Sequence, residues 1–370
     1  MLPKMLGWAF GVTVAGLIAA FLYGGTTGIA VAAILAVLEV SLSFDNAVVN
    51  ATVLGRMNER CQRLFLTVGV LIAVLGMRLL FPVLVVCVTA RVSPAQAYHL
   101  ATQGGGPNTP GTYAYLLHQA HPAIAAFGGV FLLTLFLSYI FDEREITWLS
   151  WIERPLARLG RLRQLPVVVA AGALVLTANF LAPAGAPISV MVAGALGLIV
   201  YLLVSGAGEL FEPAEDDAPA AANSARDLIK VTGRAALFVF IYLEVLDATF
   251  SFDGVIGAFA ITSDPVVIAI GLGIGAMYIR SLTVFLVRQG TLNDYAYLEH
   301  GAQWAIGALA VLLLCTIRYQ VPEIVTGLVG VGFIGMALVS SIVRNRRASR
   351  TAVVDPKPTS PVGRLTGQPN

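Results

Sequence analysis

The sequence predicts an all-α protein, a polytopic transmembrane helical bundle of about ten spans, from its composition and its apolar runs. Hydrophobic residues make up 57% of the 370 residues and charged residues only 12%, about half the charged share of a soluble domain. Mean hydropathy is +0.82. The apolar runs approach the roughly 20 residues that cross the hydrocarbon core. They lack the period-two alternation of an outer-membrane barrel.

Ten segments fit this length rule. The first follows a single lysine and has no convincing small-residue cleavage site, so we interpret it as a retained span and not as a cleaved signal peptide. The fifth and the ninth are short enough for one of them to be re-entrant. The predicted spans are residues 7–23, 29–54, 64–90, 123–141, 166–182, 187–204, 235–262, 265–288, 303–318 and 322–343.

Lysine and arginine residues gather on one side of this predicted bundle. Of the 23, 19 lie on the side that holds both termini, two lie on the opposite side, and two lie within spans. The positive-inside rule therefore predicts that both termini are cytoplasmic.

The spans group into two membrane halves. We expect an N-terminal half over residues 1–204, a cytoplasmic linker with an acidic cluster over 205–233, and a C-terminal half over 234–343. Residues 344–370 begin basic and become rich in Pro, Thr, Ser and Gly, which predicts a disordered cytoplasmic tail.

Two matching motifs stand inside apolar spans. Glu39 and Asp45 enclose five residues that end in Ser-Phe, and Asp247 and Asp253 repeat this arrangement 208 residues later. A charged side chain at the centre of a membrane helix costs roughly 2.5–3.5 kcal/mol, so such residues indicate function by default.

Each motif is followed by an arginine on the next span. Gly69 precedes Arg78 by nine residues, and Gly271 precedes Arg280 by nine, within repeat regions of residues 38–78 and 244–282. The motifs lie in the second and seventh spans, and an odd step reverses the direction of the chain through the membrane. The sequence therefore predicts an inverted repeat, an architecture that places substrate sites near the bilayer midplane.

The spacing of the acids predicts broken or kinked helices at that midplane. Acids six residues apart would point about 120° apart on an unbroken helix. Local unwinding, favoured by the small polar residues within each motif, would let both reach one site and would free carbonyl oxygens as ligands.

The charges of the spans favour a divalent cation. Five acids (Glu39, Asp45, Glu244, Asp247 and Asp253) face two bases (Arg78 and Arg280), which leaves −3 if all are ionised. The available ligands are oxygens, including that of Asn46, and hard oxygen sites suit Mg²⁺, Mn²⁺ or Ca²⁺. The alternative is a buried structural network that the two arginines clamp.

These motifs resemble the signatures of the TerC family of bacterial integral membrane proteins, or those of a neighbouring, uncharacterised bacterial family. Asp247-Ala-Thr-Phe-Ser-Phe-Asp253, with residues 259–265 and 280–282, is similar to the second signature. Glu39-Val-Ser-Leu-Ser-Phe-Asp45-Asn46, with Arg78, is similar to the first. The resemblance covers residues 30–90 and 235–290 well and the rest weakly.

The resemblance implies a LysE-type inverted repeat in a bacterial inner membrane, with manganese export as the associated activity. It implies that Glu39, Asp45, Asn46, Asp247 and Asp253 are metal ligands, with Arg78 and Arg280 as structural counter-ions. Glu244, which stands where the first half has Ala36, is a further candidate ligand or tunes Asp247. The chain departs from the TerC pattern after the second Asp, where Gly254-Val255-Ile256 replaces Ser-Ile-Pro.

Other polar residues receive simpler interpretations. His99, His118 and His121 lie in the predicted outer loop of residues 91–122, where a metal-capture site is the alternative to an incidental grouping. Residues 142–145, near two tryptophans, predict a solvated interfacial belt. Glu299 and His300 predict a surface position.

The sequence therefore predicts a secondary transporter of a divalent cation, with Mn²⁺ efflux through an acidic site at the repeat interface. No GxxxxGK[ST] motif is present, and we expect no enzyme, no organic cofactor and no nucleic-acid partner. We expect contact with lipid and with the metal ion as substrate, and a homo-oligomer is possible. Two alternatives stay open: a non-transporting membrane scaffold linked to stress or tellurite resistance, and an intramembrane aspartyl-type enzyme using Asp45 and Asp253.

Overall fold

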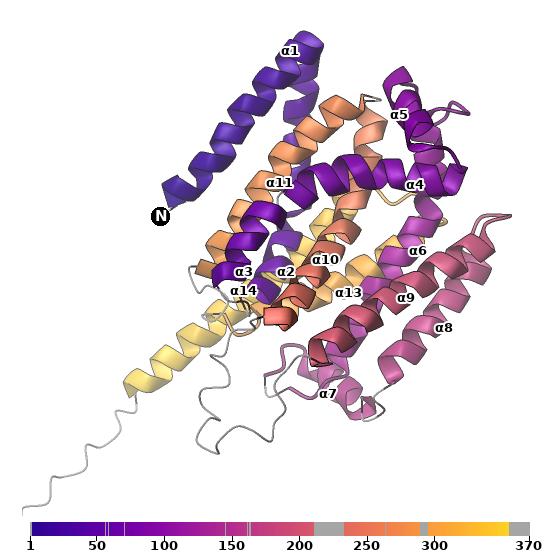
Figure 1. Cartoon of the computed structure of the whole chain (residues 1–370). Coiled ribbons are helices and arrows are strands. Elements are labelled where there is room, and N and C mark those ends of the chain that lie inside the picture. The colour runs from indigo at the N-terminus through magenta and orange to yellow at the C-terminus, as the bar shows by residue number, and fades with distance from the viewer. Residues whose placement is uncertain are drawn as a thin grey trace, which may run out of the picture.

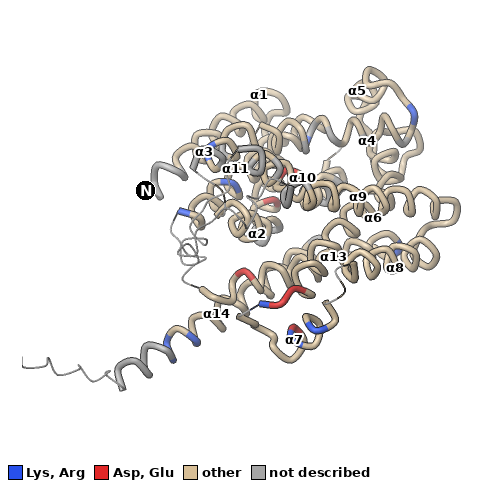
Figure 2. The backbone as a smooth tube through the Cα atoms, turned by 60° about the horizontal axis from the view of Figure 1, so that its bottom comes forward, with Lys and Arg blue, Asp and Glu red and all other residues tan. Residues whose placement is uncertain are grey.

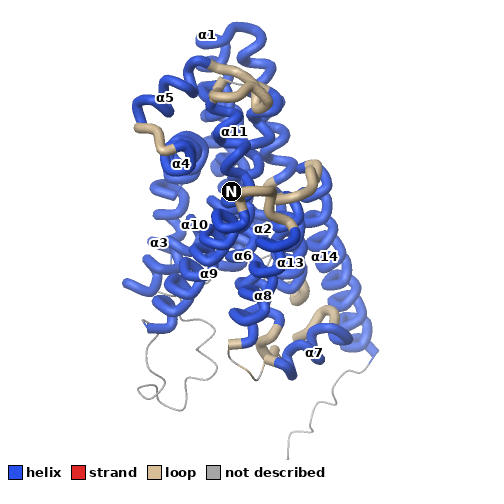
Figure 3. The backbone as a smooth tube through the Cα atoms, turned by 90° about the vertical axis from the view of Figure 1, so that its right-hand side faces the viewer, coloured by secondary structure: helices blue, strands red, loops and turns tan. Residues whose placement is uncertain are grey.

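The computed structural model is built of helices throughout its described part, as Figure 3 shows by the blue colouring of its tube. The structure describes residues 2–55, 57, 59–69, 71–144, 146–160, 162, 164–210, 233–262, 264–288 and 295–354. The prediction of an all-α protein is confirmed for these residues.

Figure 1 shows the helices along the chain. In chain order they are α1 (Leu2–Leu42), α2 (Phe44–Leu54), α3 (Glu59–Leu64), the π-helices η1 (Phe65–Gly69) and η2 (Ile72–Leu80), α4 (Phe81–Ala90), α5 (Pro94–Gln103), α6 (Tyr113–Ile140), α7 (Ser150–Leu159), α8 (Leu165–Phe180), α9 (Pro187–Leu210), α10 (Gly233–Ile261), α11 (Pro265–Arg288), α13 (Leu298–Thr316) and α14 (Glu323–Val354).

Six helices of the described chain are long and apolar enough to cross a membrane, so the protein is a multi-pass membrane protein by helix length and hydropathy. The count of ten spans stays a prediction. The six segments are Gly7–Ser41, Tyr113–Ile140, Pro187–Gly206, Pro265–Arg288, Leu298–Thr316 and Ile324–Arg347.

α1 is folded into two arms at Gly25. Gly25 has φ 61° and ψ −149°, a conformation that interrupts the helix and suits a residue without Cβ. Figure 1 shows the first arm rising from the N-terminus and the second arm returning beside it. The two arms correspond to the first and second predicted spans.

The second arm of α1 ends at a break. Ser43 separates α1 from α2 with φ −100° and ψ 17°, between the two acids of the first motif. The third predicted span is also irregular, because η1 and η2 are π-helical. π-Helical turns are rare and occur frequently at functional sites.

α11 is the helix against which both arms of α1 pack. Gly271 and Gly275 lie one turn apart on the face that meets the second arm. A Cβ at Gly271 would lie 2.7 Å from Leu35 Cβ, and one at Gly275 would meet Glu39 Cβ. Small residues at this spacing let two membrane helices approach closely.

The largest apolar core joins α6, α8, α9, α13 and α14 on one side of the bundle. A second core joins the second arm of α1 to α4, α5, α6, α10 and α11, with Leu35, Leu117 and Ile268 at 1% exposure each. The outer faces of the bundle are apolar as well: Phe180 is 73% exposed and Ile188 is 78% exposed. These exposed apolar spans imply contact with the lipid bilayer.

The segment predicted to be a long outer loop is mostly helical, so that prediction is wrong. Residues 94–103 form α5, which begins with a capping box between Ser93 and Gln96, and α6 begins at Tyr113. Proline at the first helical position and a reciprocal cap explain this helix.

The helices beside the predicted linker and the predicted tail extend into both segments. α9 reaches Leu210 and α10 begins at Gly233. Residues 211–232, which hold most of the predicted linker, lie outside the described residues. α14 continues to Val354, past the predicted start of the tail, and residues 355–370 are again outside the described part.

Candidate functional site

The candidate site is a set of charged side chains buried where α1, η2, α10 and α11 meet. Figure 2 shows charged stretches enclosed by helices that carry few charges. The buried members, with 3–7% of their surface exposed, are Glu39, Arg78, Glu244, Asp247 and Arg280. Charges so far removed from water need partners.

Arg78 on η2 pairs with Glu39 on the second arm of α1. One guanidinium nitrogen of Arg78 donates to Glu39 Oε1, and the other donates to the carbonyl of Ala73 at 2.8 Å. The hydroxyl of Ser43, at the helix break, also donates to Glu39 Oε1 at 3.2 Å. One carboxylate oxygen thus accepts both side-chain bonds.

Arg280 on α11 lies in a denser environment. Its Nη1 and Nη2 donate to the two oxygens of Glu244 at 3.3 Å each, and Nη2 donates to Asp247 Oδ2 at 3.2 Å. Nη1 also donates to the carbonyl of Phe65 at 3.1 Å, and the Phe65 ring centroid lies 4.0 Å from the guanidinium carbon. Two carboxylates, a carbonyl and a ring therefore hold one guanidinium.

Gly69, the last residue of η1, makes room for this cluster. A Cβ at Gly69 would lie 2.5 Å from Arg280 Nη1 and 2.6 Å from Glu244 Oε1. The π-helix of the first half thus approaches the ion pairs of the second half at a position without a side chain.

The two motifs contact each other in antiparallel register. Asn46 Nδ2 donates to Asp247 Oδ1 at 3.1 Å, and a Cβ at Gly254 would lie 3.1 Å from Glu39 Oε2. Glu39 and Asp247 hold equivalent positions in the two motifs, as do Asn46 and Gly254. Each acid therefore meets the seventh residue after the acid of the other motif.

The remaining two predicted ligands lie on described helices, Asp45 on α2 and Asp253 on α10. Their side chains are outside the described part of the structure, so their contacts stay a prediction. The predicted unwinding of the second motif is wrong, because α10 runs unbroken from Gly233 to Ile261. Thr249 donates its hydroxyl to the carbonyl of Val245 at 2.9 Å and so remains bonded within the helix.

Two amide oxygens on successive turns of α2 are buried without a hydrogen-bond partner among the described residues. They are the Oδ1 atoms of Asn46 and Asn50, side chains that are 3% and 2% exposed. Asn50 was not predicted. Its spacing of four residues from Asn46 on an apolar helix is the sequence signal that identifies it. Buried polar atoms are nearly always satisfied, so these two oxygens are acceptors that a cation or a water could use.

Charge and ligand chemistry bear on what this network can hold. Its three described carboxylates exceed its two guanidiniums by one negative charge if all are ionised. Within the described residues no three His, Cys, Asp or Glu side chains come together as a metal-binding group. A cation site here would therefore need the amide oxygens, or side chains outside the described part.

The three loop histidines do not form such a group either. His118 and His121 lie on α6, with ring centroids 6.5 Å apart, and His99 lies on α5. The metal-capture alternative gains no support from the described part of the chain.

His300 was predicted at the surface, and that prediction is wrong. It is 5% exposed, and its Nδ1 lies 3.4 Å from Glu153 Oε2 of α7. The neighbouring Glu299 keeps its side chain partly exposed and pairs with Arg144 at 3.7 Å. The burial follows from α7 folding back onto the start of α13, which no local pattern indicates.

Comparison with known proteins places the chain in a family. No curated protein and no solved structure matches the sequence. A family described as "Protein of unknown function (DUF475)" matches residues 44–348, most of the chain, including α2 and the helices that carry Arg78, Glu244, Asp247 and Arg280. Of the two predicted families, the uncharacterised one is therefore supported and TerC is not shown: the chain belongs to the DUF475 family.

Proposed function

We propose that this protein is a secondary transporter of a divalent metal cation, with its site between the two antiparallel motifs. The observation that carries the proposal is the buried, acid-rich network among apolar helices, with two amide oxygens beside it that have no partner among the described residues. Intramembrane ionisable groups mark ion pathways and proton relays. A cation would compensate the excess negative charge and use the free oxygens as ligands.

The contacts between the motifs support an inverted repeat as the framework of this transporter. Exchanging the two motifs converts the contact of Glu39 with Gly254 into that of Asp247 with Asn46. Packing follows the same exchange, because α1 packs against α11 and η2 packs against α10. Transporters of this architecture rock one repeat against the other around a central site.

The identity of the ion and the direction rest on the TerC resemblance, which favours Mn²⁺ efflux across a bacterial inner membrane with both termini in the cytoplasm. The oxygen-only donor set favours Mn²⁺, Mg²⁺ or Ca²⁺ over softer ions. Asp45 and Asp253 would complete the site with Glu39, Asn46, Asp247 and Glu244, while Arg78 and Arg280 hold the acids in place. Proton exchange would drive export.

The test is metal flux in proteoliposomes with Mn²⁺, Mg²⁺, Ca²⁺ or Zn²⁺ as the sole divalent cation. We expect Mn²⁺ flux that is abolished by Asp45→Asn and by Asp253→Asn and reduced by Asn50→Ala. Asn179→Ala is the matched control, since Asn179 is exposed on α8 and its side chain donates to the carbonyl of Val175 in the same helix.

Absence of flux for every ion, in protein that elutes as a single folded species, would overturn the transporter proposal. The scaffold and the aspartyl-enzyme alternatives would then take its place. Flux that persists in both aspartate variants would overturn the site and leave transport standing.

A further inference from the structure

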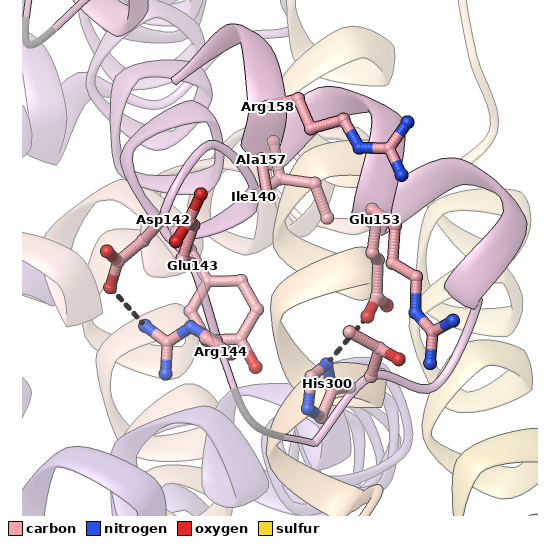
Figure 4. A pocket seen from close by; sticks show the side chains of 11 residues that line it. Ile140, Asp142, Glu143, Arg144, Glu153, Ala157, Arg158 and His300 are labelled. Atoms are coloured by element: carbon pink, nitrogen blue, oxygen red, sulfur yellow. Dashed lines mark ion pairs between the residues drawn. The ribbon is translucent and has the colours of Figure 1, made fainter. Parts of the chain in front are cut away.

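A second polar feature lies at the end of the bundle, away from the buried charge network. A cavity of about 290 Å³ opens between α7, the end of α6 and the start of α13 (Figure 4). Six charged side chains line it together with His300: the acids Asp142, Glu143 and Glu153 and the bases Arg144, Arg154 and Arg158.

Glu153 is committed to holding α7 in place. It is 5% exposed and accepts hydrogen bonds from the backbone N–H groups of Trp148 and Leu149 at 3.0 and 3.2 Å. The indole N–H of Trp304 on α13 donates to it at 3.0 Å. A carboxylate with three such donors is satisfied and serves as an anchor.

Arg144 and Asp142 are also engaged in contacts within the protein. Arg144 pairs with Asp142 at 3.6 Å and with Glu299 at 3.7 Å, and its guanidinium stacks over the ring of Tyr139 at 3.9 Å. Figure 4 shows this pair on the opposite side of the cavity from Arg158.

Arg154 and Arg158 are the two remaining bases of the cavity lining. They lie four residues apart, on neighbouring turns of one helix face, and both are exposed. Neither has an acidic partner among the residues that the structure describes, and one carboxylate of the lining, Glu143, is similarly uncommitted. The charges of the lining balance, but these two guanidiniums keep their N–H donors available, in the form that binds phosphate by paired donors.

Exposed apolar side chains of α7 adjoin these two arginines, since Trp151 lies three residues before Arg154 and seven before Arg158, close to them on the helix surface. Trp151 is 75% exposed and Leu159 is 58% exposed, and Leu162 just beyond the helix is 68% exposed. Figure 3 shows α7 lying across the end of the bundle instead of along it. A short helix that presents exposed Trp and Leu side chains beside Arg is typical of the membrane interface, where aromatic rings and basic side chains meet the lipid headgroups.

We propose that this cavity binds the phosphate headgroup of a membrane phospholipid. Arg154 and Arg158 donate to the phosphate oxygens, and the acyl chains run past Trp151 and Leu159 into the bilayer. Glu153 positions α7, and through it the two arginines, without contacting the lipid. The volume suits a headgroup and excludes a whole lipid.

The test measures lipid binding to the purified full chain in an uncharged detergent by native mass spectrometry. The probes are phosphatidylglycerol, a diacylglycerol of the same acyl chains that lacks the phosphate, and inorganic phosphate as competitor. The double variant Arg154→Gln/Arg158→Gln is compared with Arg346→Gln. Arg346 is likewise an exposed arginine on a helix at this end of the bundle, but it lies outside the cavity.

We expect one phosphatidylglycerol to bind preferentially, with its dissociation constant raised roughly ten-fold or more in the double variant, because two charge-assisted pairs are lost. Arg346→Gln should bind like the wild type. Size-exclusion profile and thermal transition identify a double variant that remains folded, as the exposure of both side chains predicts.

Three results would overturn the proposal. The first is equal retention of diacylglycerol and phosphatidylglycerol. The second is unchanged binding in a folded double variant. The third is displacement of the lipid by inorganic phosphate at equal concentration, which would assign the cavity to a soluble anion.

Discussion

The two buried guanidiniums lie in unequal environments. Arg280 stands on an α-helix and is held by Glu244, Asp247, the carbonyl of Phe65 and its ring. Arg78 stands on a π-helix and has one carboxylate, Glu39, and one carbonyl of its own helix. Arg280 is thus held by partners from both halves, while Arg78 is released by breaking one ion pair. We expect the conformational change of transport to fall on α1, α2 and η2.

The largest expected difference comes from removing each arginine in turn. Breaking a buried ion pair by deleting one partner costs about 3–5 kcal/mol. Arg280→Gln should lie at the upper end, because it leaves two carboxylates uncompensated, and Arg78→Gln at the lower end. The free energy of unfolding in mixed micelles measures both.

A second substitution sharpens this test. Adding Glu244→Gln to Arg280→Gln removes one of the stranded charges and should recover part of the lost stability. Equal losses for the two arginine variants, or a larger loss for Arg78→Gln, would contradict the inequality of the two environments.

The next largest loss of stability is expected at Asn46, whose equivalent in the second motif is Gly254. Asn46→Ala should destabilise the protein by about 1.5–3 kcal/mol, the range for a hydrogen bond to a charged group, because Asp247 Oδ1 loses the donor that Asn46 provides and keeps only the bond of Oδ2 to Arg280 among those described. Thermal unfolding of the purified protein measures the loss. Asn179→Ala, exposed on α8, should change it little, and a loss as large there would remove the argument for Asn46.

A slightly smaller effect is expected where η1 approaches the second half. Gly69→Ala should cost about 1–3 kcal/mol as an overpacking substitution, because its Cβ would collide with Arg280 and Glu244. Gly76→Ala on η2 is the control, since its Cβ would meet Ile72 Cγ2 at an ordinary 3.5 Å. Similar melting temperatures for the two variants would show that η1 does not press on the ion pairs.

The smallest effect is expected at the helix break. Ser43→Ala removes one hydrogen bond to Glu39 and should cost about 1 kcal/mol. Ser41→Ala is the neighbouring control, because the Ser41 hydroxyl is exposed and bonds only the carbonyl of Val37. If the two variants unfold at the same denaturant concentration, Ser43 contributes nothing to the Glu39 pair.

Much of the helical framework could be predicted from the sequence, because the length of an apolar run is a local property. The placement of each arginine near an acid of its own half also followed the repeated spacing of Gly69 to Arg78 and Gly271 to Arg280. The sequence could not show that the helix of the first motif breaks at Ser43 while the helix of the second motif, α10, is continuous. The two motifs have nearly the same residues, and the equivalent hydroxyls of Ser41 and Thr249 both bond the carbonyl four residues earlier, so this local pattern does not distinguish the broken helix from the continuous one.

Other features depended on tertiary packing that no local pattern shows. Glu153 and His300 come from segments far apart in the chain and meet only because α7 folds against α13. One residue next to η2 is a sequence signal of its irregular bonding. Pro82 follows Arg78 by four residues and has no N–H group, so the α-helical hydrogen bond to the carbonyl of Arg78 cannot form. Asn50 was identified from the structure, because its buried Oδ1 has no hydrogen-bond partner among the described residues.

η2 has a mechanical consequence. A π-helical turn closes its hydrogen bonds one residue later than an α-helical turn, and one residue corresponds to about 100° of rotation in an α-helix. A return of η2 to α-helical bonding would therefore rotate the segment that carries Arg78 about the helix axis and shift it along that axis, while the neighbouring helices stay packed. We expect that the ion pair of Arg78 with Glu39 would have to break for this rotation to occur.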